Sequence, residues 1–198
     1  MVLAAAMKTR LSIVMCGVSL ISALTMCVSV VAGQLSPADW SRADAATVRL
    51  VPSAFSNLPP SVRSAMEQRR CTVPQPVDSG RPRNVISGHF TDAKSTGWAV
   101  LCSRERRSAV LVFHGKDFGD VDTLAEAPDS EYLQTVSGGR IGFSRALSVA
   151  APKVVKQSRV AAKPRVVDHD GIVDAFEGKG STIWYWSGDK WISALGSD

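Results

Sequence analysis

The 198-residue sequence has few of the residue types on which common enzyme sites depend. It contains three histidines, scattered along the chain, and four cysteines. It has no metalloprotease helix motif, phosphate-binding loop or dinucleotide-binding fingerprint. Predicted strands do not alternate with predicted helices, as they would in a parallel α/β enzyme. These absences argue against several large enzyme classes.

Strong net charge is also absent. The formal charge of +5 falls to +3 once residues 1–33 are set aside, because they hold two of the 23 basic residues and none of the 18 acidic ones. So mild a charge does not argue for nucleic acid as a partner. Residues 132–167 hold seven basic side chains and no acidic one. We favour a solvated strand pair or loop there, with a patch for anionic polysaccharide or lipid headgroups as the alternative.

An export signal stands at the start of the chain. Lys8 and Arg10 precede an uncharged apolar run, residues 11–33, that ends in small residues. This pattern is typical of a signal peptide, and we expect cleavage before Gln34 and a place in the periplasm or outside the cell. The run is also long enough to span a bilayer if uncleaved, and a lipid anchor on Cys27 is a further alternative.

The remaining residues, 34–198, are enough for one domain with its own core. Cys71 and Cys102 are the cysteines left in it, and in an oxidising compartment an even pair predicts a disulfide. Two buried free thiols are the alternative. Two cysteines 31 residues apart lack the ligand spacing of a metal site.

The order of elements predicts an α+β fold, with short N-terminal helices packed on a mainly antiparallel β-sheet. Residues 34–70 are expected to be helical, with one helix capped by Ser36 and a second starting at Pro59. Residues 84–198 are expected to be mainly β. The predicted strand regions are 84–90, 98–103, 108–114, 164–176 and 181–195.

The last of these regions folds back on itself as a hairpin around Gly188-Asp189. In that register Trp186 faces Trp191, and Trp184 lies on the same face as Trp186. Three tryptophans on one face could form a platform on which sugars or peptides stack. Core packing is the alternative that we favour.

The stretch from Asp168 to Asp174 resembles part of a calcium loop, with Asp168, Asp170 and Asp174 as oxygen ligands and Gly171 for the turn. No closing Glu follows, and a tight β-turn is the favoured interpretation. No other cofactor is expected. Ser144 lies in a Gly-x-Ser-x-Ala sequence that approaches a nucleophile elbow but lacks the final Gly, so a small hydrolase is only an alternative.

Two stretches resemble known sequences. Gly88-His89-Phe90-Thr91-Asp92 through Trp98-Ala99-Val100-Leu101 is similar in register to the FG-GAP/VCBS type of repeat, with His89 where Asp is usual. Residues 168–198 resemble the C-terminal end of exported bacterial proteins of unknown function. Together they cover about a quarter of the chain, and the resemblance implies no activity.

The sequence therefore favours an exported, non-catalytic binding or structural module of the cell envelope. A carbohydrate- or peptidoglycan-binding module that uses Trp184, Trp186 and Trp191 is the first alternative, and a small secreted hydrolase the second. An envelope component or polysaccharide is the expected kind of partner. Contact with a membrane is expected only through the signal segment, if it is not removed.

Overall fold

Two antiparallel sheets dominate the computed structural model, which describes residues 35–160 and 166–196. The first sheet has the order β3-β4-β5-β6: β3 (Val85–Gly88), β4 (Gly97–Arg104), β5 (Arg107–His114) and β6 (Asp120–Pro128). The second has the order β10-β13-β12-β11-β9: β9 (Arg145–Ala150), β10 (Arg159–Val160), β11 (Gly171–Phe176), β12 (Gly180–Trp186) and β13 (Trp191–Leu195). Two small sheets pair β1 (Arg49–Leu50) with β2 (Val73–Pro74), and β7 (Leu133–Thr135) with β8 (Ile141–Phe143).

The helices are short and lie outside these sheets. They are α1 (Pro37–Ala46), α2 (Pro60–Gln68) and α3 (Pro152–Gln157), with 3-10 turns η1 (Pro52–Ala54), η2 (Lys116–Phe118), η3 (Asp129–Tyr132) and η4 (Ser137–Gly139). The predicted export segment, residues 1–33, lies outside the described residues, and residues 35–198 form one compact unit. In the described part of the chain, no helix is long and apolar enough to cross a membrane.

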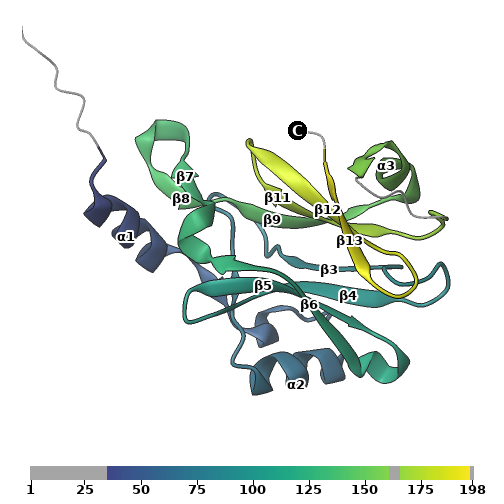
Figure 1. Ribbon diagram of the computed structural model, residues 1–198. Coiled ribbons are helices and arrows are strands. Elements are labelled where there is room, and N and C mark those ends of the chain that lie inside the picture. Colours follow the sequence, from purple (N-terminus) through teal and green to yellow (C-terminus); the bar gives the residue numbers. More distant parts are fainter. Residues whose placement is uncertain (1–34, 161–165, 197–198) are drawn as a thin grey trace, which may run out of the picture. The chain divides into compact units, whose positions relative to one another are not determined.

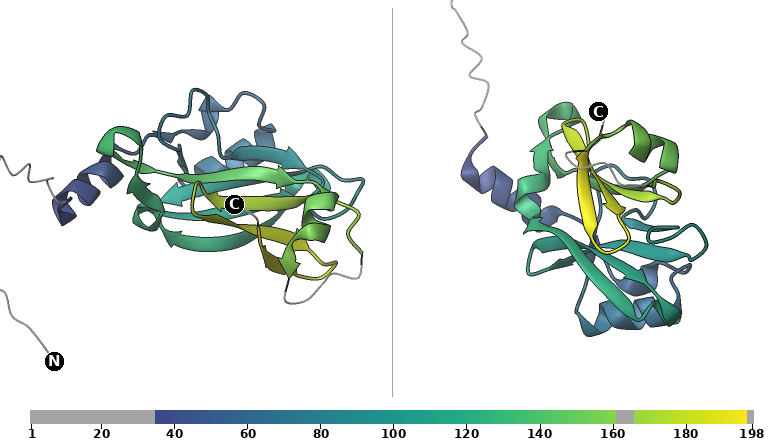
Figure 2. Two further views of the ribbon diagram at one scale, coloured as in Figure 1. Left: turned by 90° about the horizontal axis from the view of Figure 1, so that it is seen from above. Right: turned by 45° about the vertical axis from the view of Figure 1, so that its right-hand side comes forward.

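The two large sheets stack face to face (Figure 1), and Figure 2 shows the same two layers from other directions. Strand residues alternate between the two faces of a sheet, so one set of side chains from each sheet fills the space between them. The buried cluster there includes Leu101 and Val112 from the first sheet and Leu147 and Ile172 from the second. This core fixes the mutual position of the strands whose ends form the candidate site.

Helix α2 packs on the opposite face of the first sheet and lies below β4 and β5 in Figure 1. Val62 and Met66, one turn apart on α2, share a buried cluster with Trp98 and Phe113 of those strands. Cys71 and Cys102 form the predicted disulfide, which ties the segment just after α2 to β4. The antiparallel sheets and the disulfide that we predicted are thus confirmed.

The start of α1 shows why this segment is helical. Ser36 caps it: the backbone N–H of Asp39 donates to the Ser36 hydroxyl, and the Asp39 carboxylate accepts from the Ser36 backbone N–H at 2.7 Å. This reciprocal pair is a capping box, and Pro37 occupies the first helical position, where its missing N–H costs nothing. The helix runs to Ala46.

Two hairpins show their turns clearly, and the last one has the predicted register. Arg104 pairs with Arg107 across a two-residue turn whose residues both have positive φ, the geometry of a type I′ hairpin. Trp186 pairs with Trp191, and the backbone N–H of Ser187 donates to the carbonyl of Lys190 across Gly188-Asp189.

The basic stretch, residues 132–167, differs from the expected strand pair or loop. It contains β7, β8, β9, α3 and β10, so its charges are divided among separate elements. Arg145 is fully buried, whereas Lys153 and Lys156 lie on the exposed side of α3. The part from 161 to 165, which holds Lys163 and Arg165, lies outside the described residues. The observed strand β11 is shorter than the strand predicted over 164–176, because it begins only at Gly171.

Candidate functional site

The tryptophan-bearing hairpin, β12 with β13, places its side chains on two different faces. Ile183 and Tyr185 belong to the small cluster that includes Val155 of α3. Trp184 and Trp191 pack against the cluster between the two sheets. The alternation follows from the two-residue period of a strand, and it puts Trp184, Trp186 and Trp191 on the inner side of the hairpin.

These three tryptophans do not form one open platform. Each is partly buried, and the indole nitrogen of Trp184 is buried without a hydrogen-bond partner. Trp186 and Trp191 meet edge to face, with ring centroids 5.5 Å apart. Because Trp184 and Trp191 also pack against the core, Trp186 is the tryptophan of the three best placed to touch a ligand.

A carboxylate lies beside this tryptophan pair. Nε1 of Trp191 donates to Oδ2 of Asp122 at 2.8 Å, and Nε2 of His114 lies 2.8 Å from the same oxygen. The Asp122 side chain keeps 35% of its surface exposed. The second carboxylate oxygen therefore has room for a donor from solvent or ligand.

Strand register explains how His114 and Asp122 meet. His114 pairs with Asp120 and Val112 pairs with Asp122, so His114 and Asp122 are diagonal neighbours on one face. That is the face on which Val112 contributes to the core between the sheets. The His114 ring lies 6.1 Å from the ring of Trp186, which completes a cluster of three aromatic rings and one carboxylate. We call Trp186, Trp191, His114 and Asp122 the Trp186 surface.

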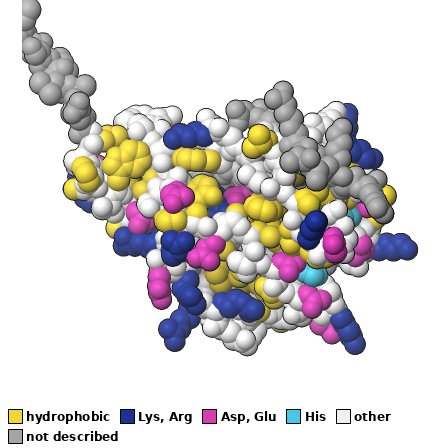
Figure 3. Space-filling model, in the orientation of Figure 1, with side chains coloured by type: hydrophobic (Ala, Val, Ile, Leu, Met, Phe, Trp, Pro, Cys, Tyr) yellow, Lys and Arg dark blue, Asp and Glu magenta, His cyan; other side chains and the backbone are white. Residues whose placement is uncertain are grey.

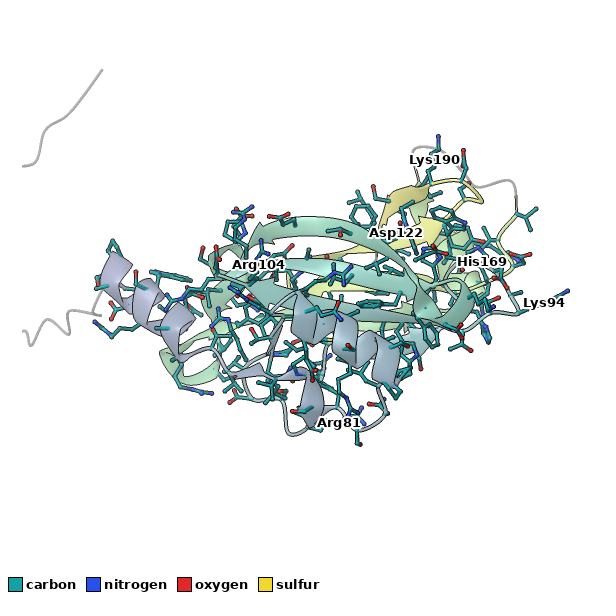
Figure 4. The ribbon with its side chains drawn as sticks, turned by 90° about the horizontal axis from the view of Figure 1, so that it is seen from below. Arg81, Lys94, Arg104, Asp122, His169 and Lys190 are labelled. Carbon is teal, nitrogen blue, oxygen red and sulfur yellow. A yellow bond between two sulfur atoms is a disulfide. The ribbon has the colours of Figure 1, made fainter. Side chains whose placement is uncertain are left out.

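The Trp186 surface lies at one end of the sandwich. Figure 4 labels Asp122 at the same end as His169 and Lys190, and Figure 3 shows acidic side chains gathered around a histidine on the exposed face. His114 ends a predicted strand, whereas Asp122 lies in β6, which was not among the predicted strands. Their meeting with the tryptophans depends on the packing of one sheet on the other, for which a single sequence carries no signal.

The three predicted calcium ligands are not brought together. Asp174 receives Nε of Arg145 at 2.8 Å on one oxygen and Nη2 at 2.7 Å on the other, and both side chains are almost wholly buried. Asp170 instead accepts the backbone N–H of His89 at 3.0 Å. Across the described ranges, no group of three or more His, Cys, Asp or Glu side chains is arranged to hold a metal ion.

The segment before Asp170 is held by an aromatic stack. His169 lies parallel to Tyr185, with ring centroids 4.2 Å apart, and the Tyr185 hydroxyl donates to the carbonyl of Val166 at 3.2 Å. Burial raises the pKa of Tyr185, because the phenolate loses hydration. Asp168 offers its backbone N–H to the same hydroxyl at 3.4 Å. These contacts make the segment a packed part of the fold.

Ser144 is not placed as a nucleophile would be. It is buried, and its hydroxyl lies 3.4 Å from the carbonyl of Gly142, to which it donates. The backbone of Ser144 bonds to Tyr132 and Glu177. Among the hydrogen bonds of the described residues, none joins Ser144 to a histidine. Serine catalysis requires a general base next to the hydroxyl, and the hydrogen bonds of Ser144 do not supply one.

In comparisons with protein-family models, curated proteins and solved structures, no match to this chain is found. The likeness of residues 88–101 to an FG-GAP/VCBS repeat therefore stays a prediction. In that segment the carboxylate of Asp92 accepts the backbone N–H groups of Lys94 and Ser95, both at 2.7 Å. These bonds, the one from Lys94 first, lower the pKa of Asp92.

Proposed function

We propose that this protein is an exported, non-catalytic binding module of the cell envelope that holds carbohydrate, including the glycan of peptidoglycan, on the Trp186 surface. The proposal rests chiefly on the partly exposed indole of Trp186 and the nearby carboxylate of Asp122. Within the described part of the chain, Oδ2 of Asp122 takes the side-chain hydrogen bonds and Oδ1 takes none. Sugars present apolar C–H faces and a rim of hydroxyl groups. An aromatic ring and a carboxylate at contact distance complement both.

The chemistry of the surface favours binding over turnover. Asp122 is bonded to His114 and to Trp191, which orient its carboxylate before any ligand arrives. An oriented acceptor loses less conformational entropy when a hydroxyl binds, so a small surface can still select its ligand. The role of Asp122 in this proposal is that of an acceptor for sugar hydroxyls.

The proposed location has two supports. A disulfide such as Cys71–Cys102 is typical of proteins in oxidising compartments. The sequence of residues 1–33 has the basic start, apolar run and small residues of an export signal. Export would place the Trp186 surface among cell-wall polysaccharides.

Titration of intrinsic tryptophan fluorescence with soluble peptidoglycan fragments and neutral oligosaccharides tests the function. We expect a saturable change that is lost in Trp186→Ala and weakened in Asp122→Asn. Trp40→Ala is the matched control, because Trp40 is another partly buried tryptophan that packs against the same core but lies on α1. Equal loss of the signal in both tryptophan variants, or no change with any glycan, would count against the proposal.

A further inference from the structure

A second concave feature lies away from the Trp186 surface. A half-open groove of about 520 Å³ runs between the C-terminal half of α1, residues 75–82 and β8. In Figure 4, α1 lies at the opposite end of the ribbon from the labelled Asp122 and His169. The volume falls within the range of about 300–1,000 Å³ that is usual for small-molecule sites.

The walls of this groove are mainly apolar and are held by backbone hydrogen bonds. The side chains that line it include Ala46, Val48, Leu50, Val77 and Ile141. The backbone N–H of Val77 donates to the carbonyl of Phe143 at 2.7 Å, and that of Gln75 donates to the carbonyl of Val48 at 2.8 Å. A groove held in this way exists before any ligand binds, which lowers the entropic cost of binding.

The close approach of two walls requires a glycine. A Cβ at Gly142 would lie 2.6 Å from two atoms of the Val77 side chain, well inside van der Waals contact. The absence of a side chain there lets Val77 lie directly on β8. Gly142 therefore sets the depth of the groove on this side.

The polar side chains in the base already have partners. The Gln75 amide nitrogen donates to the carbonyls of Val73 and Arg83, at 3.0 and 3.1 Å, and its oxygen accepts the Arg83 N–H at 2.7 Å. The hydroxyl of Thr47 donates to the carbonyl of Ala43 at 3.1 Å. A peptide backbone in this groove would lose hydration without gaining enough partners, whereas a hydrocarbon chain has no such groups to satisfy.

Two arginines, Arg81 and Arg140, lie at the rim of the groove. Arg140 is bonded to Asp78 at 2.6 Å, but both side chains are more than half exposed, so the pair is weak and open to competition. Arg81 is exposed on the same rim and makes no salt bridge within the described part of the chain. The charged residues that line the groove thus carry one net positive charge, which suits an anionic head group.

We infer that this groove binds a single-chain fatty acid, with the hydrocarbon against Val48, Val77 and Ile141 and the carboxylate near Arg81 and Arg140. The apolar side chains of the walls select the hydrocarbon chain, and the arginines select its charged end. The site is separate from the Trp186 surface, and the inference stands whether or not that surface binds a glycan.

A chain-length series tests the apolar part. Each added CH₂ that becomes buried should tighten binding about fourfold, so affinity should rise from hexanoate to dodecanoate and then level off once the groove is full. Isothermal titration with the protein purified from an exporting host, at fatty acid concentrations below micelle formation, measures this. No binding, or an affinity that does not depend on chain length, would overturn the inference.

Paired variants locate the site. Val48→Asp should weaken decanoate binding about tenfold or more, because it places a charge against the hydrocarbon. Val51→Asp is the matched control, since Val51 is 56% exposed against 59% for Val48 and does not line the groove. Equal weakening by both variants would show that the fatty acid binds elsewhere.

Head-group variants test the charge. Arg81→Ala and Arg140→Ala should each weaken decanoate binding up to about fivefold, and Arg104→Ala, an exposed arginine of β4 outside the groove, should not. Decanol should bind more weakly than decanoate. If decanol binds as tightly, or if apolar peptides bind and decanoate does not, the assignment to a fatty acid is wrong.

Discussion

Replacing Asp174 by asparagine removes the charge that balances Arg145 inside the sandwich while keeping the shape of the side chain. The Arg145 side chain has no exposed surface, and that of Asp174 has 4%. Arg145 also donates to the hydroxyl and the carbonyl of Ser108, at 3.0 and 3.2 Å, and to the carbonyl of Ala125 at 2.8 Å. It therefore joins β9 and β11 of one sheet to β5 and β6 of the other.

The size of the effect follows from this burial. Removing one partner of a buried ion pair costs about 3–5 kcal/mol, because the remaining charge stays in a medium that solvates it poorly. Domains of this size are stable by about 5–15 kcal/mol in total, so Asp174→Asn should lose a large part of the free energy of unfolding. The Tyr132 ring, 4.2 Å from the guanidinium carbon of Arg145, compensates only a fraction of the lost charge.

Urea unfolding followed by tryptophan fluorescence measures this loss. The control is Glu126→Gln, which breaks the exposed Arg107–Glu126 pair between β5 and β6 and should cost less than about 1 kcal/mol. The double variant Arg145→Met, Asp174→Leu should be more stable than Asp174→Asn, since it leaves no buried charge. If Asp174→Asn costs no more than Glu126→Gln, the reasoning about the buried pair fails.

Three further predictions concern stability. Replacing Cys71 and Cys102 by serine should cost about 3–4 kcal/mol from the entropy of the opened loop, measured by urea unfolding; intact protein should resist alkylation at both positions until it is reduced. Burial raises the pKa of Tyr132 and Tyr185, the two tyrosines of the chain, above the usual 10.0. The tyrosinate absorbance at 295 nm should therefore appear late in an alkaline titration, and the free energy of unfolding should fall as the pH rises past 10. Tyrosine titration near pH 10 in the folded protein would contradict this. Ser36→Ala should lower stability by about 1 kcal/mol by removing the cap of α1, and an unchanged melting temperature would count against that cap.

Local patterns in the sequence predicted the elements whose causes are local. The Ser36-Pro37 start, the turn at Gly188-Asp189 and the pairing of Trp186 with Trp191 each depend on neighbouring residues, and the structure has all three. The disulfide was predicted by the count of cysteines outside the export segment. These features depend on turn chemistry, caps and the two-residue period of strands.

Features that depend on distant residues could not be predicted in this way. Asp174 was interpreted as a possible metal ligand because of its spacing from Asp170, whereas its oxygens are taken by Arg145, 29 residues earlier. Asp122 and Trp191, 69 residues apart, meet because two sheets pack together. A single sequence holds no signal for such pairs. β6 and β9 were missed because they lack the continuous buried apolar run that marks β5.

The central claim is that Trp186 contacts a glycan. The chain has five tryptophans, so the indole N–H signals in a nuclear magnetic resonance spectrum can be assigned one by one with single variants. During titration with peptidoglycan fragments, we predict that the signals of Trp186 and its neighbour Trp191 move together and saturate, while those of Trp40 and Trp98 stay in place. Unmoved signals from Trp186 and Trp191 at saturating glycan would contradict the claim.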